Sequence, residues 1–335
     1  MTSEMACNFI LQRYEHNLKA SVKSGGAMLK VENLNKKLIN FELKDISFHL
    51  PKGYIMGLIG VNASGKSSLI KTIINIYHKD SGKIYIDGIS MDDDEKEAKN
   101  LMGIILDENF YEPGLSAEDN AKYFGKYFEH YDHDIFLRYC KRFHVDYKKK
   151  LKKLSKGQQM KFQIAFALSH EAKLFIMDEP CGNLDQAFRQ EFMDIMQELI
   201  ADGERSILIA THQTDTLDQI ADYITLVDKG RIVFSMSKEE LMDKYVLLSG
   251  EADKISKLPD KLVIYRENGL YRSMALIYNP YTQSMTVAEG LSQDFLERVE
   301  LGLAKLRPTL EEIMYFMVKG GFHGVENHMA GQPAL

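Results

Sequence analysis

The chain has 335 residues, of which 45% are hydrophobic and 27% are charged, a balance typical of an ordinary globular protein that can form more than one domain. The formal net charge is -6. This charge argues against a nucleic-acid partner, because nucleic-acid binders present a basic surface to the phosphate backbone. We interpret one basic run as a solvated face: Lys148, Lys149, Lys150, Lys152 and Lys153.

The cysteines and the hydropathy predict a cytosolic protein. Cys7, Cys140 and Cys181 are far apart and lack metal-ligand spacing, so they predict neither a disulfide framework nor a metal site. No segment approaches the roughly 20 apolar residues that a transmembrane helix needs. Any attachment to a membrane is therefore expected to come through a partner.

Residues 1–27 are predicted to be an N-terminal extension, since their polarity is mixed and Ser24-Gly25-Gly26 breaks the pattern. From residue 28 to about 245, apolar strands alternate with amphipathic helices, which indicates a parallel α/β sheet. Predicted strands cover 29–34, 54–59, 83–87, 101–106, 173–178, 206–210, 222–227 and 231–235. Predicted helices cover 65–77, 116–128, 132–143, 157–169, 187–202 and 214–220. The segment from about 108 to 155 has no strand and is predicted to be an inserted helical subdomain.

Residues 246–321 are predicted to form a small α+β domain, followed by a flexible tail at 322–335. Short strands are expected at 262–265, 271–278 and 284–287, and a helix is expected at 291–306. Thr309 and Glu312 have the spacing of a capping box, which starts a last helix that Gly320-Gly321 ends. This helix has an apolar surface that suits core packing or a dimer contact equally, made of Leu310, Ile313, Met314, Phe316 and Met317.

A phosphate-binding loop follows the short apolar strand that ends at Ile59. The loop matches G-x-x-x-x-G-K-[ST], and its glycines let backbone N–H groups and a helix N-terminus surround phosphates. Lys66 is predicted to reach the terminal phosphates, and Ser67 to hold Mg²⁺. The loop alone predicts binding of ATP or GTP, through Gly60, Val61, Asn62, Ala63, Ser64, Gly65, Lys66, Ser67 and Ser68.

A second apolar strand ends in two carboxylates, Asp178 and Glu179. Asp178 is predicted to bind Mg²⁺, and Glu179 to act as the general base that polarises the attacking water. Many strands end in an acidic turn, so this feature gains its meaning from the phosphate loop that precedes it in the chain.

The segment Leu154-Ser155-Lys156-Gly157-Gln158 stands just before a predicted helix. Ser155 can cap that helix, and Gly157 allows a close backbone approach, although an ordinary N-cap would look the same. The segment resembles the L-S-G-G-Q signature of the ATP-binding-cassette (ABC) family, and its place between the phosphate loop and the acidic strand extends the resemblance over residues 28 to about 245. The resemblance implies a P-loop cassette with a parallel sheet core, an antiparallel β subdomain and an inserted helical subdomain.

Further motifs are similar to those of the ABC family. Gly182-Asn183-Leu184-Asp185 resembles its D-loop, and His212 matches its switch histidine, which contacts the γ-phosphate. In this family two subunits pack head to tail around ATP. The resemblance therefore implies that Glu179, His212 and Lys66 are catalytic, and that ATP also contacts four residues of the opposite subunit: Ser155, Gly157, Gln158 and Asp185.

Several positions depart from the family pattern. Asp107 stands where the Q-loop glutamine is expected, and it could still ligate Mg²⁺. Leu38 replaces the aromatic residue that stacks on adenine, with Phe41 as a candidate substitute. Ala63 replaces a common glycine of the phosphate loop, and Lys156 adds a charge to the signature.

The resemblance implies an ATP-hydrolysing subunit, as a homodimer or paired with another ATPase, on the inner face of a cell membrane beside a separate membrane subunit. The segment from Arg307 to Ile313 resembles the C-terminal tail of bacterial ATPase subunits from exporter-type ABC systems, including those for antimicrobial peptides and bacitracin-like drugs. Two alternatives remain open: a non-transport ABC ATPase, and a nucleotide-binding regulator with little turnover. A coiled coil or a second cassette would favour the former, and neither is present in the sequence.

Overall fold

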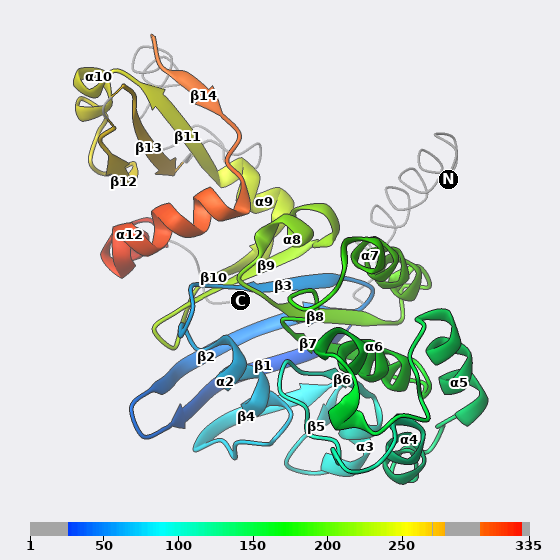
Figure 1. Ribbon diagram of the computed structural model, residues 1–335. Coiled ribbons are helices and arrows are strands. Elements are labelled where there is room, and N and C mark those ends of the chain that lie inside the picture. The colour runs from blue at the N-terminus through cyan, green and yellow to red at the C-terminus, as the bar shows by residue number, and fades with distance from the viewer. Residues whose placement is uncertain (1–25, 270, 279–301, 330–335) are drawn as a thin grey trace. The chain divides into compact units, whose positions relative to one another are not determined.

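The computed structural model describes residues 26–269, 271–278 and 302–329, with backbone only at 322–329 (Figure 1). The chain divides into two compact units. The first comprises Met1–Met56 and Ser67–Thr211, and the second comprises Gly57–Lys66 and His212–Leu335. The predicted N-terminal extension, with Cys7, lies almost wholly outside the described residues.

The first unit contains an antiparallel sheet in the order β2-β1-β4-β5. Its strands are β1 (Ala27–Lys37), β2 (Glu42–Pro51), β4 (Ser81–Ile86) and β5 (Ile89–Ser90). Leu29 pairs with Leu50 on one side and with Ile86 on the other, so the apolar faces of three strands coincide. This sheet corresponds to the antiparallel β subdomain that the sequence predicted.

The first unit also contains strands in the order β3-β8-β7-β6, beginning with the first half of β3 (Ile55–Ile59), and the pairs β8–β7 and β7–β6 are parallel. The others are β8 (Ser206–Ala210), β7 (Leu174–Asp178) and β6 (Met102–Ile105). Every residue of β7 and β8 is buried, as expected for parallel strands covered on both faces. The helices that accompany them are α2 (Lys66–Ile73), α3 (Glu95–Asn100), α6 (Lys156–Ala167) and α7 (Gln186–Ile200).

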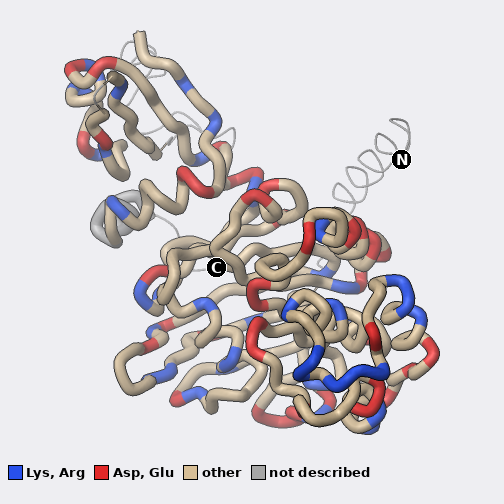
Figure 2. Tube along the Cα trace, viewed as in Figure 1, with Lys and Arg blue, Asp and Glu red and all other residues tan. Residues whose placement is uncertain are grey.

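The segment predicted to be an inserted helical subdomain contains α4 (Ala117–Gly125), α5 (His133–Arg142) and the 3-10 turn η1 (Leu151–Lys153). Side chains cap both long helices, because Ser116 accepts from the N–H of Asp119 and Asp132 accepts from that of Ile135. The run of lysines from 148 to 153 is exposed, as predicted. Figure 2 shows acidic and basic positions scattered along the described chain.

The second unit contains strands in the order β10-β9-β3. Only the second half of β3, from Gly57 on, belongs to this unit. The strands β9 (Tyr223–Asp228) and β10 (Arg231–Ser237) pair antiparallel, and α8 (Thr214–Ile220) and α9 (Lys238–Lys244) flank them in the sequence. A Cβ atom at Gly57 would lie 2.6 Å from a methyl carbon of Leu217. Helix α8 therefore packs directly on the strand that leads to the phosphate loop.

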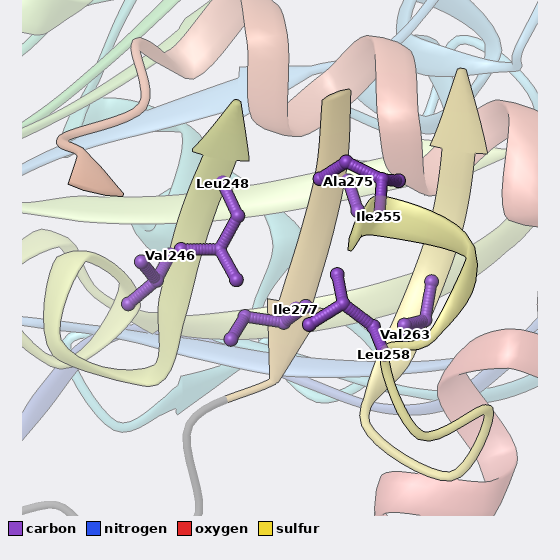
Figure 3. Close-up of a cluster of buried hydrophobic side chains, with 7 residues drawn as sticks. All are labelled: Val246, Leu248, Ile255, Leu258, Val263, Ala275 and Ile277. Atoms are coloured by element: carbon purple, nitrogen blue, oxygen red, sulfur yellow. The ribbon is translucent and has the colours of Figure 1, made fainter. Parts of the chain in front are cut away.

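The C-terminal part of this unit is a sheet in the order β12-β13-β11-β14. Its elements are β11 (Tyr245–Gly250), α10 (Ala252–Ser256), β12 (Val263–Glu267), β13 (Ser273–Tyr278) and β14 (Ala304–Leu306). Figure 3 shows the apolar cluster between the sheet and α10, which consists of Val246, Leu248, Ile255, Leu258, Val263, Ala275 and Ile277. This sheet therefore has an apolar core of its own.

The last helix, α12 (Leu310–Met329), begins at the predicted capping box. The backbone N–H of Thr309 donates to Glu312 Oε2 at 2.8 Å, and the N–H of Glu312 donates to Thr309 Oγ1 at 3.2 Å. Four of its five predicted apolar residues are buried within this chain, so core packing accounts for them: Leu310, Ile313, Phe316 and Met317.

Two C-terminal predictions need correction. Residues 304–306 were predicted to be helical but form β14, because Leu306 pairs with Leu247 on β11. Gly321 has non-helical torsion angles, as expected of a helix end, yet helical structure continues to Met329 in the segment predicted to be a flexible tail. The predicted strand at 284–287 and most of the predicted helix at 291–306 lie outside the described residues.

The capping box predicts the effect of Thr309→Ala. Loss of the side-chain acceptor should lower the free energy of unfolding by about 1 kcal/mol and speed hydrogen exchange at the amide of Glu312. Glu312→Gln is the matched control, because glutamine can also close a capping box. Equal exchange at this amide in the wild type and in Thr309→Ala would show that the cap does not stabilise α12.

Candidate nucleotide-binding site

The part of the phosphate loop from Gly60 to Lys66 belongs to the second unit, where it follows β3. A Cβ atom at Gly60 would lie 2.3 Å from the carbonyl oxygen of Val227 and 2.6 Å from Ser64 Oγ, so no larger residue fits there. The N–H of Gly230 donates to the carbonyl oxygen of Ser64 at 2.9 Å. The end of β9 and the turn after it therefore fix the shape of the loop.

Lys66 lies over this loop with only 7% of its surface exposed. Its Nζ donates to the carbonyl oxygen of Gly60 at 2.7 Å and to that of Val61 at 3.3 Å. An ammonium group bonded to two neutral carbonyls can exchange them for phosphate oxygens, which form stronger, charge-assisted hydrogen bonds. The position of Lys66 thus suits its predicted role.

Ala63 adopts a left-handed conformation, with φ at 62°. The left-handed region costs roughly 1–2 kcal/mol for a residue with a Cβ atom. The loop therefore tolerates the methyl group that the sequence places here, but under backbone strain. The neighbouring Gly65, at φ 115°, has no such cost.

The first unit contains the predicted oxygen ligands Ser67, Asp107 and Asp178. Asp178 ends β7 and is buried. Burial alone would lower the pKa of Lys71 on α2, but its hydrogen bond to Glu108 (Nζ–Oε2 2.7 Å) and the charges of Glu108 and Asp178 raise that pKa. Lys71 therefore stays charged beside this acidic edge of the sheet.

Glu179 follows β7 in a left-handed conformation, with φ at 49°. Its N–H donates to the carbonyl oxygen of Ala210 at 2.8 Å, and its Oε2 accepts from Thr211 Oγ1 at 2.8 Å. Sequence reasoning missed Thr211. The signal was its position directly after β8, since the parallel register pairs Asp178 with Ala210 and so places Thr211 beside Glu179.

The structure brings the signature and D-loop segments together within the first unit. Ser155 caps α6 by accepting from the N–H of Gln158 at 3.2 Å. A Cβ atom at Gly157 would lie 2.6 Å from the carbonyl oxygen of Asn183, so a glycine is needed for this approach. Asn183 Nδ2 also donates to Asp107 Oδ1 at 3.5 Å.

Asp185 has a structural role in addition to its predicted contact with the opposite subunit. It caps α7 through the N–H of Phe188 at 2.9 Å and forms an ion pair with Lys161 at 3.2 Å. The hydrogen bond from Phe188, followed by that from Lys161, lowers the pKa of the carboxyl. The contact of Asp185 with ATP in the opposite subunit stays a prediction.

His212 and Phe41, which the sequence also predicted to be site residues, lie in different units. His212 is exposed in the second unit, two positions before α8. Phe41 is half-buried in the first unit, where its carbonyl oxygen accepts from the N–H of Leu38 at 2.7 Å. In the same loop Ile39 is 99% exposed and offers another apolar surface. The roles of His212 and Phe41 stay predictions.

The donor set suits Mg²⁺, which prefers oxygen ligands. Within the described residues, no three or more His, Cys, Asp or Glu side chains gather into a site that could hold a metal ion alone. No helix in the described ranges is long and apolar enough to span a membrane.

Comparison with known proteins agrees with this fold. A family model for ABC transporters matches residues 43–182. The petrobactin import ATP-binding protein YclP of Bacillus subtilis (strain 168) is 31% identical over 231 residues, covering 66% of this chain and 91% of that protein. The lantibiotic transport ATP-binding protein SrtF of Streptococcus pyogenes is 29% identical over 229 residues, which cover 66% of this chain and 98% of SrtF. The solved structure of an ATP-binding subunit of an ABC transporter matches with a TM-score of 0.59 and 24% identity. The match covers 64% of this chain and 91% of that subunit.

The phosphate loop, the acidic strand end and the signature helix define a P-loop nucleotide-binding ATPase. The chain belongs to the ATP-binding proteins of ABC transporters. It is an ABC-type ATPase subunit of a transporter, and the nucleotide that it binds is ATP.

The strain at Ala63 predicts that Ala63→Gly stabilises the protein. The gain from relieving the left-handed φ should exceed the entropy cost of glycine, so the free energy of unfolding should rise by about 0.5–1 kcal/mol. Urea unfolding measures this change. Ala201→Gly is the matched control and should lose stability, because Ala201 has φ -64°. A loss in both variants would contradict the assigned strain.

Proposed function

We propose that this chain hydrolyses ATP in a head-to-tail pair and thereby powers a separate membrane subunit. The position of Glu179 carries the proposal. Its carboxylate directly follows the buried Asp178, and Thr211 orients it through a hydrogen bond. A carboxylate held in this way can accept a proton from a water that attacks the terminal phosphate.

Each side chain has a distinct proposed role in this reaction. Lys66 offsets phosphate charge, and His212 contacts the γ-phosphate. Ser67, Asp178 and Asp107 would hold Mg²⁺, which would supply positive charge that offsets the charge of the phosphates. Phe41 contacts the adenine. The backbone of the phosphate loop from Gly60 to Ser68 surrounds the phosphates.

The signature residues act on the nucleotide of the opposite subunit. The N-terminus of α6 carries partial positive charge and begins at Ser155, which is exposed. Gly157 and Gln158 lie in its first turn, and Asp185 belongs to the nearby D-loop. ATP would thus join two subunits, either two copies or a paired ATPase, and hydrolysis would separate them.

The proposed location is the inner face of a cell membrane, where the segment at about 108–155 transmits closure to the membrane subunit. Residues 28–245 are the proposed ATPase domain, and 246–321 are the accessory domain.

SrtF is a lantibiotic transport ATP-binding protein, and YclP is a petrobactin import ATP-binding protein. We favour export of peptides, drugs or antibiotics, because the segment from Arg307 to Ile313 resembles the tail of ATPase subunits from exporters.

Glu179→Gln tests the proposed base. ATP turnover should fall by about 10²–10⁴-fold, because the amide cannot accept the proton, while ATP still binds. ATP should then convert the variant into a stable dimer, as measured by light scattering. Glu198→Gln, at an exposed position of α7, is the matched control and should change neither property.

Three results would each contradict part of the proposal. Unchanged hydrolysis in Glu179→Gln would reject Glu179 as the base. A trapped variant that binds ATP but stays monomeric would reject the head-to-tail pair. If the wild type, assayed with its membrane subunit, releases no phosphate, the alternative of a regulator with little turnover would replace hydrolysis.

A further inference from the structure

Two glutamines of α6 that sequence reasoning did not select hold the segment around Asp107. The first is Gln163, whose surface is 3% exposed. Its Oε1 accepts from the N–H of Leu106 at 3.0 Å, and its Nε2 donates to the carbonyl oxygen of Leu106 at 2.9 Å. One amide thus satisfies both backbone groups of the residue that directly precedes Asp107.

The second is Gln159, one turn earlier on the same face of α6. Its Oε1 accepts from Asn109 Nδ2 at 3.0 Å. Its Nε2 donates to the carbonyl oxygens of Leu151 (3.1 Å) and Leu154 (3.0 Å), in the turn that leads to the signature. Gln159 therefore connects the chain after Asp107 to the turn before Ser155.

The D-loop reaches the same segment from another direction. Asn183 Nδ2 donates to Asp107 Oδ1, and the carbonyl oxygen of Asn183 lies against Gly157. The residues on both sides of Asp107 are thus bonded to the helix that begins with the signature. Because a helix moves as a rigid element, a displacement of its first turn carries Gln159 and Gln163 with it.

We propose that Gln163 is a positioning residue that places Asp107 for Mg²⁺, and that Gln159 makes this placement depend on the signature turn. The proposal depends on the proposed role of Asp107 as a metal ligand. In this proposal Gln163 would contact neither nucleotide nor metal, because its amide bonds to the Leu106 backbone. It acts through the Leu106 backbone, in the way that outer residues orient the ligands of a metal site.

Gln163→Met tests this inference in the full-length protein, because methionine fills a similar volume but makes neither hydrogen bond. Equilibrium binding of a fluorescent ATP analogue is measured over a range of Mg²⁺ concentrations. The Mg²⁺ concentration for half-maximal enhancement of binding should rise about 10-fold, the lower end of the effect of such outer residues. Binding of the analogue without Mg²⁺ should stay unchanged.

Met160→Ala is the matched control, since it destabilises the same helix at a buried position and leaves both glutamine side chains in place. It should leave the Mg²⁺ requirement unchanged. Asp107→Ala should raise that requirement, and adding Gln163→Met to Asp107→Ala should have no further effect. An additive effect in the double variant would show that Gln163 does not act through Asp107, and would overturn the inference.

Gln163→Glu provides a second test that does not depend on the methionine variant folding. A protonated carboxyl can accept from the Leu106 N–H and donate to the Leu106 carbonyl, as the amide does. An ionised carboxyl cannot donate, and burial at this position raises the pKa of the new carboxyl. The Mg²⁺ requirement of this variant should therefore approach the wild-type value as the pH falls.

The outcomes distinguish a failure of the positioning role of Gln163 from a failure of the metal role of Asp107. If Asp107→Ala raises the Mg²⁺ requirement but neither Gln163 variant does, Gln163 has no positioning role and only this inference fails. If Asp107→Ala leaves the requirement unchanged, the proposed metal role of Asp107 fails, and this inference fails with it. A Mg²⁺ requirement of Gln163→Glu that does not change with pH, relative to wild type, also overturns the inference.

Discussion

Parallel strands impose one constraint on which the rest of this molecule depends: where each strand ends, the backbone leaves the ladder and its polar groups need new partners. Other elements supply these partners here. Gln163 of α6 bonds to both backbone groups of Leu106 after β6, and the carbonyl oxygen of Ala210 on β8 accepts from the N–H of Glu179 after β7. In the second unit, the N–H of Gly230 donates to the carbonyl oxygen of Ser64 in the phosphate loop. The loops that carry the chemistry are therefore fixed by their neighbours.

Close packing of backbone against backbone fixes the same loops sterically. Gly60 lies against the carbonyl of Val227, and Gly157 lies against the carbonyl of Asn183. Neither position has space for a Cβ atom. The glycines of the phosphate loop and the signature thus have a structural role in the protein alone, in addition to any approach to phosphate. Ala63 shows the opposite case, in which a methyl group is kept at an energetic cost.

The second unit links the C-terminal helix to the helix that follows His212. Burial raises the pKa of the Asp218 carboxyl on α8, which accepts a hydrogen bond from the N–H of Leu310 at the start of α12. Leu217, the preceding residue, packs against Gly57 on β3. Helix α8 is therefore held on one side by the strand that leads to the phosphate loop and on another by α12.

The sequence by itself determined the order of most strands and helices, the phosphate loop and the capping box at Thr309, because these depend on residues that are near each other in the chain. The membership in the ABC family also followed from short motifs in a fixed order. Only the tertiary structure decided that Gln163 holds Leu106, that Thr211 holds Glu179, that residues 304–306 form a strand and that the apolar face of α12 is buried in this chain. Each of these joins residues that are distant in the sequence, or depends on what covers a surface, and local patterns carry no information about either.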